Sequence, residues 1–168
     1  MLKGLLEQVR TETMNPGREK AMIRSIHHSC FTVSNIERSI VFYRDLLGMK
    51  VLWDSVEAGL QYKGPVCDRI TGCPGTEQHL VYLGIGGGVL ELVEYTPTGR
   101  PLKDHKASDI GAAHVCFKTD DINTLYEKLR ANNVAVHCPP QNRGELSLFY
   151  FRDPDGIILE VIEGKTRV

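Results

Sequence analysis

The sequence predicts an α+β domain built from two copies of one strand–helix–three-strand module. Two observations carry this prediction. Residues 28–44 and 114–130 align at an offset of 86 with five identities in 17 positions, where average residue usage gives roughly one. The segments 87–94 and 156–163 align as well, at an offset of 69. A repeat this short cannot bury both faces of its own sheet, so the two modules are expected to pack together.

Each module reads as a β-type run, a polar helix cap, an apolar helical pattern and three further strands. The caps are Ser34-Asn35 and Asp120-Asp121, and such residues typically begin helices. Tight turns, among them Asp153-Pro154-Asp155-Gly156, lead into the last strands. The expected elements are 25–33, 35–47, 49–53, 77–84 and 88–95, then 112–119, 121–131, 134–138, 146–152 and 157–162.

The first module is longer than the second. From His28 to Glu91 is 63 residues (91 − 28), whereas from His114 to Glu160 is 46 (160 − 114), a difference of 17. The Gly- and Pro-bearing stretch 61–77 is the expected place of this insertion.

The predicted domain covers residues 22–164, with modules at 22–97 and 110–164, and an N-terminal extension over 1–21 precedes it. In the extension Leu2, Leu5, Leu6 and Val9 fall at helical spacing. This segment is expected to dock on the body or on a second subunit, or else to be a partly ordered terminus.

Composition excludes several classes of protein. The 168 residues are 42% apolar and 24% charged, as in ordinary soluble globular proteins. Twenty basic and 21 acidic residues give a net charge of −1, so no nucleic-acid or membrane partner is expected. No apolar run is long enough to cross a bilayer. Five irregularly spaced cysteines do not form a disulfide framework, which indicates reduced thiols and a cytoplasmic location.

Four residues at matching positions of the repeat form a candidate metal site: His28, Glu91, His114 and Glu160. Side chains alternate between the two faces along a strand, so equivalent positions of the two modules are expected to lie on equivalent faces of their sheets. If that face is the inner one, two imidazoles and two carboxylates meet where the modules join. This donor set suits a divalent first-row ion with octahedral preference. A lone histidine on a strand is usually structural, but a glutamate within an apolar strand needs a partner.

Several motifs resemble those of the vicinal oxygen chelate superfamily, which includes glyoxalase I, methylmalonyl-CoA epimerase, extradiol dioxygenases and the fosfomycin and bleomycin resistance proteins. These motifs are residues 26–33, 42–49, 90–92, 113–115 and 151–156 with Leu159-Glu160. The resemblance covers residues 22–164. It implies two βαβββ modules whose mixed sheets curve around a metal-holding cleft, with His28, Glu91, His114 and Glu160 as ligands.

The order His-Glu-His-Glu is similar to that of bacterial glyoxalase I. The resemblance therefore implies a metal-dependent lyase, isomerase or epimerase that acts on a small oxygenated substrate through an enediolate or enolate. One divalent ion (Ni, Co, Zn, Mn or Fe) would be its cofactor. By the same resemblance Glu160 is the leading catalytic base and Glu91 its counterpart, although their roles could be exchanged.

Two positions depart from the glyoxalase I pattern. That enzyme commonly has an Arg four residues after its first His ligand and an Asn four after its first Glu, both serving glutathione. Thr32 and Tyr95 stand there in this chain, which leaves glutathione hemithioacetal open as the substrate.

Two other functions are kept as alternatives, a ferrous-iron extradiol-type dioxygenase and a drug-sequestering protein of the bleomycin-resistance kind. The insertion and the N-terminal extension indicate a homodimer, which many superfamily members use to complete their clefts. The sequence leaves open whether the modules pair within one chain or between two.

Overall fold

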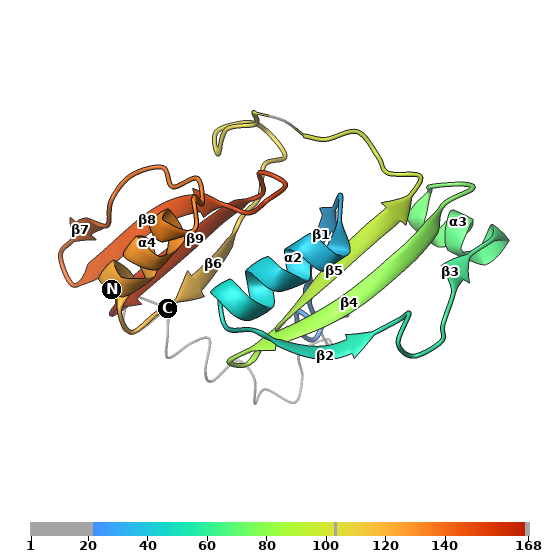
Figure 1. The fold of residues 1–168 in the computed structure, drawn as a ribbon, viewed down its shortest axis with the longest axis horizontal. Coiled ribbons are helices and arrows are strands. Elements are labelled where there is room, and N and C mark those ends of the chain that lie inside the picture. The colour runs from blue at the N-terminus through green and yellow to red at the C-terminus, as the bar shows by residue number, and fades with distance from the viewer. Residues whose placement is uncertain (1–21, 103, 167–168) are drawn as a thin grey trace.

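The computed structural model describes residues 22–102 and 104–166, which form two mixed β-sheets lying side by side, each accompanied by a helix (Figure 1). This arrangement confirms the predicted α+β class. The predicted extension over 1–21 lies outside the described residues. None of the described helices is long and apolar enough to cross a membrane.

The first sheet has the strand order β1-β5-β4-β2, with β3 paired to β4. Strand β1 runs parallel to β5, and the other pairs are antiparallel. Its elements are β1 (Ser29–Val33), α2 (Ile36–Ile40), the π-helix η1 (Val41–Leu46) that continues α2, β2 (Lys50–Asp54), β3 (Tyr62–Lys63), α3 (Pro65–Thr71), β4 (Glu77–Ile85) and β5 (Gly88–Thr96). The insertion thus contributes β3 and α3, which lie at the end of the molecule away from the second sheet (Figure 1).

The second sheet has the order β6-β9-β8-β7. Its elements are β6 (Val115–Lys118), α4 (Ile122–Ala131), β7 (Gln141–Arg143), β8 (Leu146–Arg152) and β9 (Ile158–Gly164). The strand expected at 134–138 is wrong, since only Val136 forms an isolated bridge there, with Phe151. Pro139 and Pro140 follow and have no N–H to donate, so the ladder along β8 resumes only at β7.

Both helices begin in the same way, as the repeat predicts. The side chains of Asn35 and Asp121 accept a first-turn backbone N–H at 2.8 and 2.9 Å. From the last strand of each module, Glu94 and Glu163 accept the N–H of the first helical residue at 2.7 and 3.0 Å. Two acceptors at each helix start satisfy N–H groups that have no partner inside the helix.

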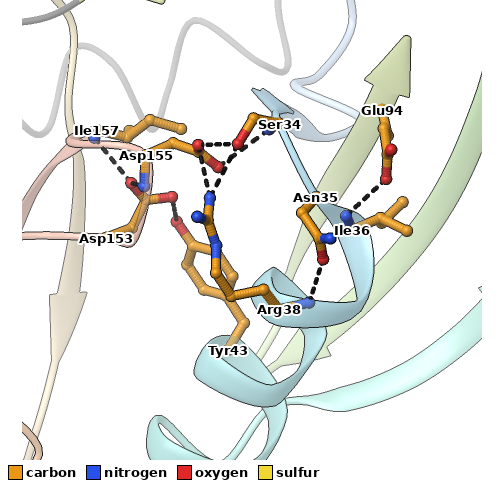
Figure 2. Close-up of polar contacts among 9 residues, drawn as sticks. All are labelled: Ser34, Asn35, Ile36, Arg38, Tyr43, Glu94, Asp153, Asp155 and Ile157. Atoms are coloured by element: carbon orange, nitrogen blue, oxygen red, sulfur yellow. Dashed lines mark hydrogen bonds and ion pairs between the residues drawn. The ribbon is translucent and has the colours of Figure 1, made fainter. Parts of the chain in front are cut away.

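The modules join on the side of the sheets that carries the helices. Figure 2 shows the turn between β8 and β9 docking on the start of α2 and on η1. The Tyr43 hydroxyl donates to Asp153 at 3.0 Å, and the Arg38 guanidinium lies 2.7 Å from Asp155, which also accepts the Ser34 N–H. A hydrophobic cluster continues across this junction and includes Ile36, Ile40, Tyr43, Leu83, Leu92, Ile122, Leu129, Phe149, Phe151 and Leu159.

Candidate metal centre

Glu91 lies on the face of the first sheet opposite α2. Its neighbours Leu90 and Leu92 belong to the core cluster, and side chains alternate along a strand. The strand register places Cys30 and Tyr82 beside Glu91. We call this side the first His–Glu face.

The second sheet repeats the arrangement. Leu159 and Val161 belong to the core cluster, so Glu160 faces away from α4. Cys116 and Tyr150 are its partners on the adjacent strands. This side is the second His–Glu face.

The first His–Glu pair is close and partly buried. His28 Nε2 lies 3.2 Å from Glu91 Oε2, and the two side chains are 31% and 11% exposed. Burial, a hydrogen bond with Glu91 and its charge raise the pKa of Cys30 to about 12, and the same causes raise the pKa of Tyr82 to about 12. The thiol and the phenol therefore stay neutral beside the carboxylate at physiological pH.

The second pair has nearly the same geometry. His114 Nε2 lies 3.1 Å from Glu160 Oε2, with exposures of 38% and 16%. Burial, followed by the charge of Glu160 and a hydrogen bond with it, raises the pKa of Cys116 to about 12. Burial and Glu160 also raise the pKa of Tyr150. Each module thus places a histidine, a glutamate, a tyrosine and a cysteine together.

The structure brings each histidine to its own glutamate and does not bring the two pairs together. Within residues 22–102 and 104–166, no group of three or more His, Cys, Asp or Glu side chains is placed to hold one ion. The modules contact each other through Tyr43 and Asp153 on the helix side, whereas the pairs lie on the opposite faces of their sheets. The four predicted ligands consequently form two separate pairs in the described chain.

His27 lies next to His28 in space as well as in sequence. Its Nδ1 lies 2.8 Å from Nδ1 of His28. Both residues precede β1, which begins at Ser29, so the alternation of strand side chains does not apply to them.

The donor chemistry of the two pairs fits a divalent ion. Imidazole nitrogens and carboxylate oxygens are the ligands that first-row divalent ions accept. Each pair supplies one imidazole nitrogen and one carboxylate oxygen. The residues present therefore suit a nitrogen–oxygen site.

Tyr82 and Tyr150 are not among the residues that the internal repeat predicts. The two glutamates are 69 positions apart, but the tyrosines are 68 apart (150 − 82), because the two hairpins differ by one residue in length. The repeat alignment therefore does not superimpose them. Each tyrosine lies directly across a predicted hairpin from its glutamate, so the register of the hairpin is the signal that identifies both.

Two surface hollows lie away from the pairs. One, of about 430 Å³, is lined by Leu102, Asp104 and residues of the turn after β8. The other, of about 410 Å³, lies at the end of β4 near Leu60, His79 and Glu94. In the latter region His79 Nε2 lies 2.9 Å from Asp54 Oδ1. Neither hollow includes a predicted metal ligand.

Known proteins are similar to this chain in sequence and in fold. The family model "Glyoxalase/Bleomycin resistance protein/Dioxygenase superfamily" matches residues 25–161. The lactoylglutathione lyase of Salmonella typhimurium is 30% identical over 142 residues, covering 82% of this chain and 91% of that protein. The enzyme of the same name from Haemophilus influenzae is 29% identical over 143 residues, covering 84% and 93%.

Solved structures show a similar fold. A glyoxalase family protein from Bacillus cereus superposes with a TM-score of 0.76 at 18% identity, covering 89% of this chain and all of that one. The trypanothione-dependent glyoxalase I of Leishmania major does so with a TM-score of 0.56 at 25% identity, covering 84% and 87%. The family model spans most of the chain, and the chain belongs to the glyoxalase/bleomycin resistance protein/dioxygenase superfamily.

Proposed function

We propose that this protein is a metal-dependent, glyoxalase-like lyase or isomerase that acts on a small oxygenated substrate. The observation that carries the proposal is the repeated His–Glu pair, with nitrogen–oxygen distances of 3.2 and 3.1 Å on equivalent faces of the two sheets. The similarity to two lactoylglutathione lyases supports the choice of reaction class.

His28, Glu91, His114 and Glu160 would together hold one divalent ion, of Ni, Co, Zn, Mn or Fe. When bound, such an ion supplies a Lewis acid that polarises adjacent oxygens of a substrate and stabilises the negative charge that develops on them. The carboxylate of Glu160 removes the proton from the carbon next to a carbonyl and returns it to the neighbouring carbon, with Glu91 as its counterpart. The two roles could be exchanged.

Tyr82 and Tyr150 act as positioning residues in this proposal. The strand register places each tyrosine beside its glutamate, and that glutamate helps to raise the pKa of the phenol. A neutral donor on the carboxylate restricts its orientation and leaves the opposite oxygen for the proton.

We further propose that the complete site forms in a homodimer, where the first His–Glu face of one copy meets the second face of the other. Three features support this arrangement. The modules of one chain join through their helix sides. Strands β1 and β6, next to the two histidines, each lie at the edge of a sheet, where backbone groups can pair with another chain. Each pair supplies only two protein groups to an ion that prefers six donors.

A cytoplasmic place of action is part of the same proposal. It is supported by the free state of all five cysteines, since reduced thiols are typical of that compartment.

Elemental analysis and proton exchange test the function. The purified protein is expected to contain one divalent ion per chain, and His28→Ala is expected to remove it. The control is His105→Ala, whose imidazole contacts the Leu102 carbonyl instead. The metal-loaded protein should exchange the α-proton of a 2-oxo substrate or its hemithioacetal in D₂O, as followed by NMR. No exchange with any 2-oxo or acyl-thioester compound would rule out the proposed reaction.

The same preparations separate the alternatives. Oxygen consumption on addition of a catechol would favour a ring-cleaving dioxygenase. Drug binding by a protein that carries no metal would favour a sequestering function.

A further inference from the structure

A line of aromatic rings runs along the first His–Glu face, starting at the His–Glu pair. The ring of His28 lies 5.7 Å from that of Tyr82, centroid to centroid. Tyr82 lies 5.5 Å from Trp53, and Trp53 lies 6.3 Å from Tyr62 of the insertion. We call Tyr82, Trp53 and Tyr62 the aromatic strip. It connects the predicted metal ligands with the insertion that only the first module contains.

The rows of residues beyond Glu91 on this face are uncharged. The row next to Glu91 has Val93 paired with Leu80, and Thr32 of β1 lies beside Val93. In the following row Tyr95 pairs with Gln78, which pairs with Tyr62. From Glu91 to Tyr62, the described residues of these rows include no charged group apart from Glu91 itself. Lys50 lies beyond the other end, opposite Gly84.

The insertion also reaches the end of this face, because Cys73, which follows α3, lies within electrostatic range of Tyr95, as does Cys30. At the other end of the face, the Leu52 side chain packs over Gly84, in the space that a side chain at position 84 would need. Leu52 is 58% exposed. Apart from Glu91 and Lys50, the described residues that these strands place on the face are apolar or neutral.

The second His–Glu face is different. There the ring series continues from His114 through Tyr150 to His137, at 5.2 and 6.1 Å. The register also puts Lys118 and Arg152 on this face. Although the pairs repeat, their surroundings do not, and the first face is the apolar one.

We infer that the first His–Glu face binds a flat, uncharged group of the substrate, about the size of an aromatic ring, on the aromatic strip. The inference rests on the proposed function in one respect, since the reacting oxygens are taken to lie at the His28–Glu91 pair. Aromatic side chains present a large apolar surface and favour stacked or edge-on contact with another ring. A charged substituent would lose its hydration on this face without gaining an opposite charge. The substrate class is thus a vicinally oxygenated compound with an apolar, preferably aryl, substituent.

Trp53 allows a direct test, because it is the only tryptophan of the chain. Quenching of its fluorescence is measured on the metal-loaded protein with benzohydroxamate and acetohydroxamate. These probes share the chelating group and differ in a phenyl against a methyl group. Burial of the larger apolar surface predicts binding of benzohydroxamate that is tighter by about tenfold or more.

Variants that retain Trp53 locate the preference. Tyr62→Ala and Leu52→Ala are each expected to lower the ratio of the two affinities by about threefold or more, as smaller apolar contact predicts. Val41→Ala is the matched control, because Val41 is similarly exposed (54% against 58% for Leu52) and lies on η1, away from this face. Circular dichroism and thermal melting establish that each variant is folded.

Equal affinities for the two probes, or a ratio that neither face variant changes, would overturn the inference. Titration of metal-free protein with phenol and with ethanol separates it from the proposed function. A preference for phenol that depends on Tyr62 and Leu52 would uphold the aromatic strip even in a protein that proved to hold no metal. A metal-loaded protein with no aryl preference would leave the reaction standing and reject the strip.

Discussion

The hydroxyl of Tyr43 donates a 3.0 Å hydrogen bond to the carboxylate of Asp153, 110 positions further along the chain. Both residues are buried, with exposures of 0% and 6%. The other oxygen of Asp153 accepts the backbone N–H groups of Asp155 and Ile157. One carboxylate therefore shapes the turn after β8 and attaches it to the first module (Figure 2).

Replacing Tyr43 with Phe removes this attachment with little change in shape. A buried carboxylate then loses one of its donors, which is expected to lower the free energy of unfolding by about 1–3 kcal/mol. Urea denaturation followed by far-UV circular dichroism measures the loss. Tyr126→Phe is the control, because that residue contacts Phe149 and Arg130 through its ring. Equal stability of the two variants would contradict this role of Tyr43.

The ion pair at the same junction predicts a dependence on pH. Burial acts to raise the pKa of Asp155, but hydrogen bonds from Ser34 and Arg38 outweigh it and hold this pKa below its usual value. An acid whose pKa is lowered in the folded state contributes stability above its unfolded pKa, about 4. That contribution disappears as the pH falls through the folded pKa.

Arg38→Ala is accordingly expected to reduce the acid-induced loss of stability below about pH 4, as measured by urea denaturation across a pH series. The matched control is Arg44→Ala, which removes an exposed Arg–Asp pair with Asp45 at 2.6 Å. Exposed pairs contribute little, so this variant should follow the wild-type curve. The opposite ranking of the two variants would refute the prediction.

Two glutamates three residues apart on β5 are expected to respond oppositely to mutation. Glu91→Ala should abolish metal binding. Glu94→Ala should keep the metal and lower the free energy of unfolding by about 1 kcal/mol, because Glu94 accepts an N–H at the start of α2. Elemental analysis and thermal melting of both variants check the pair of outcomes. Loss of metal in the Glu94 variant alone would show that the two faces are wrongly assigned.

Mixing two inactive variants tests the proposed sharing of the site between copies. His28→Ala and Glu160→Ala should each hold no metal. A heterodimer of the two would contain one site with both defects and one intact site. After co-refolding in equal amounts, roughly a quarter of the wild-type sites should return, since half of the dimers are mixed.

The returned sites are counted by bound metal and by proton exchange. Mixing two preparations of the same variant is the control and should restore nothing. If the site forms within one chain, the mixture of different variants will restore nothing either, which would reject the shared site.

The local features of this protein were predictable because they depend on neighbours in the sequence. Helix caps such as Asn35 and Asp121 and the turn 153–156 are short-range signals, and they lie where they were expected. The internal repeat carried the prediction further, because equivalent positions in two modules must face the same way. The equivalence of the two His–Glu pairs follows from the repeat, although their role as metal ligands stays a prediction.

The features that escaped prediction depend on pairing across strands. Tyr82 and Tyr150 lie beside the glutamates only through hairpins of unequal length, and the expected strand at 134–138 failed where two prolines interrupt a ladder. The insertion had no periodic pattern of its own, so the contact of Tyr62 with Trp53 could not be anticipated.

The sequence by itself determined that there are two modules and that each carries one histidine and one glutamate at equivalent positions. Repetition is sufficient for both. Only the tertiary structure decided that the modules join through Tyr43 and Asp153 on their helix sides, so that the two pairs stay apart within the described chain. Which faces of two sheets bury each other depends on contacts between residues 110 positions apart, and no local pattern records them.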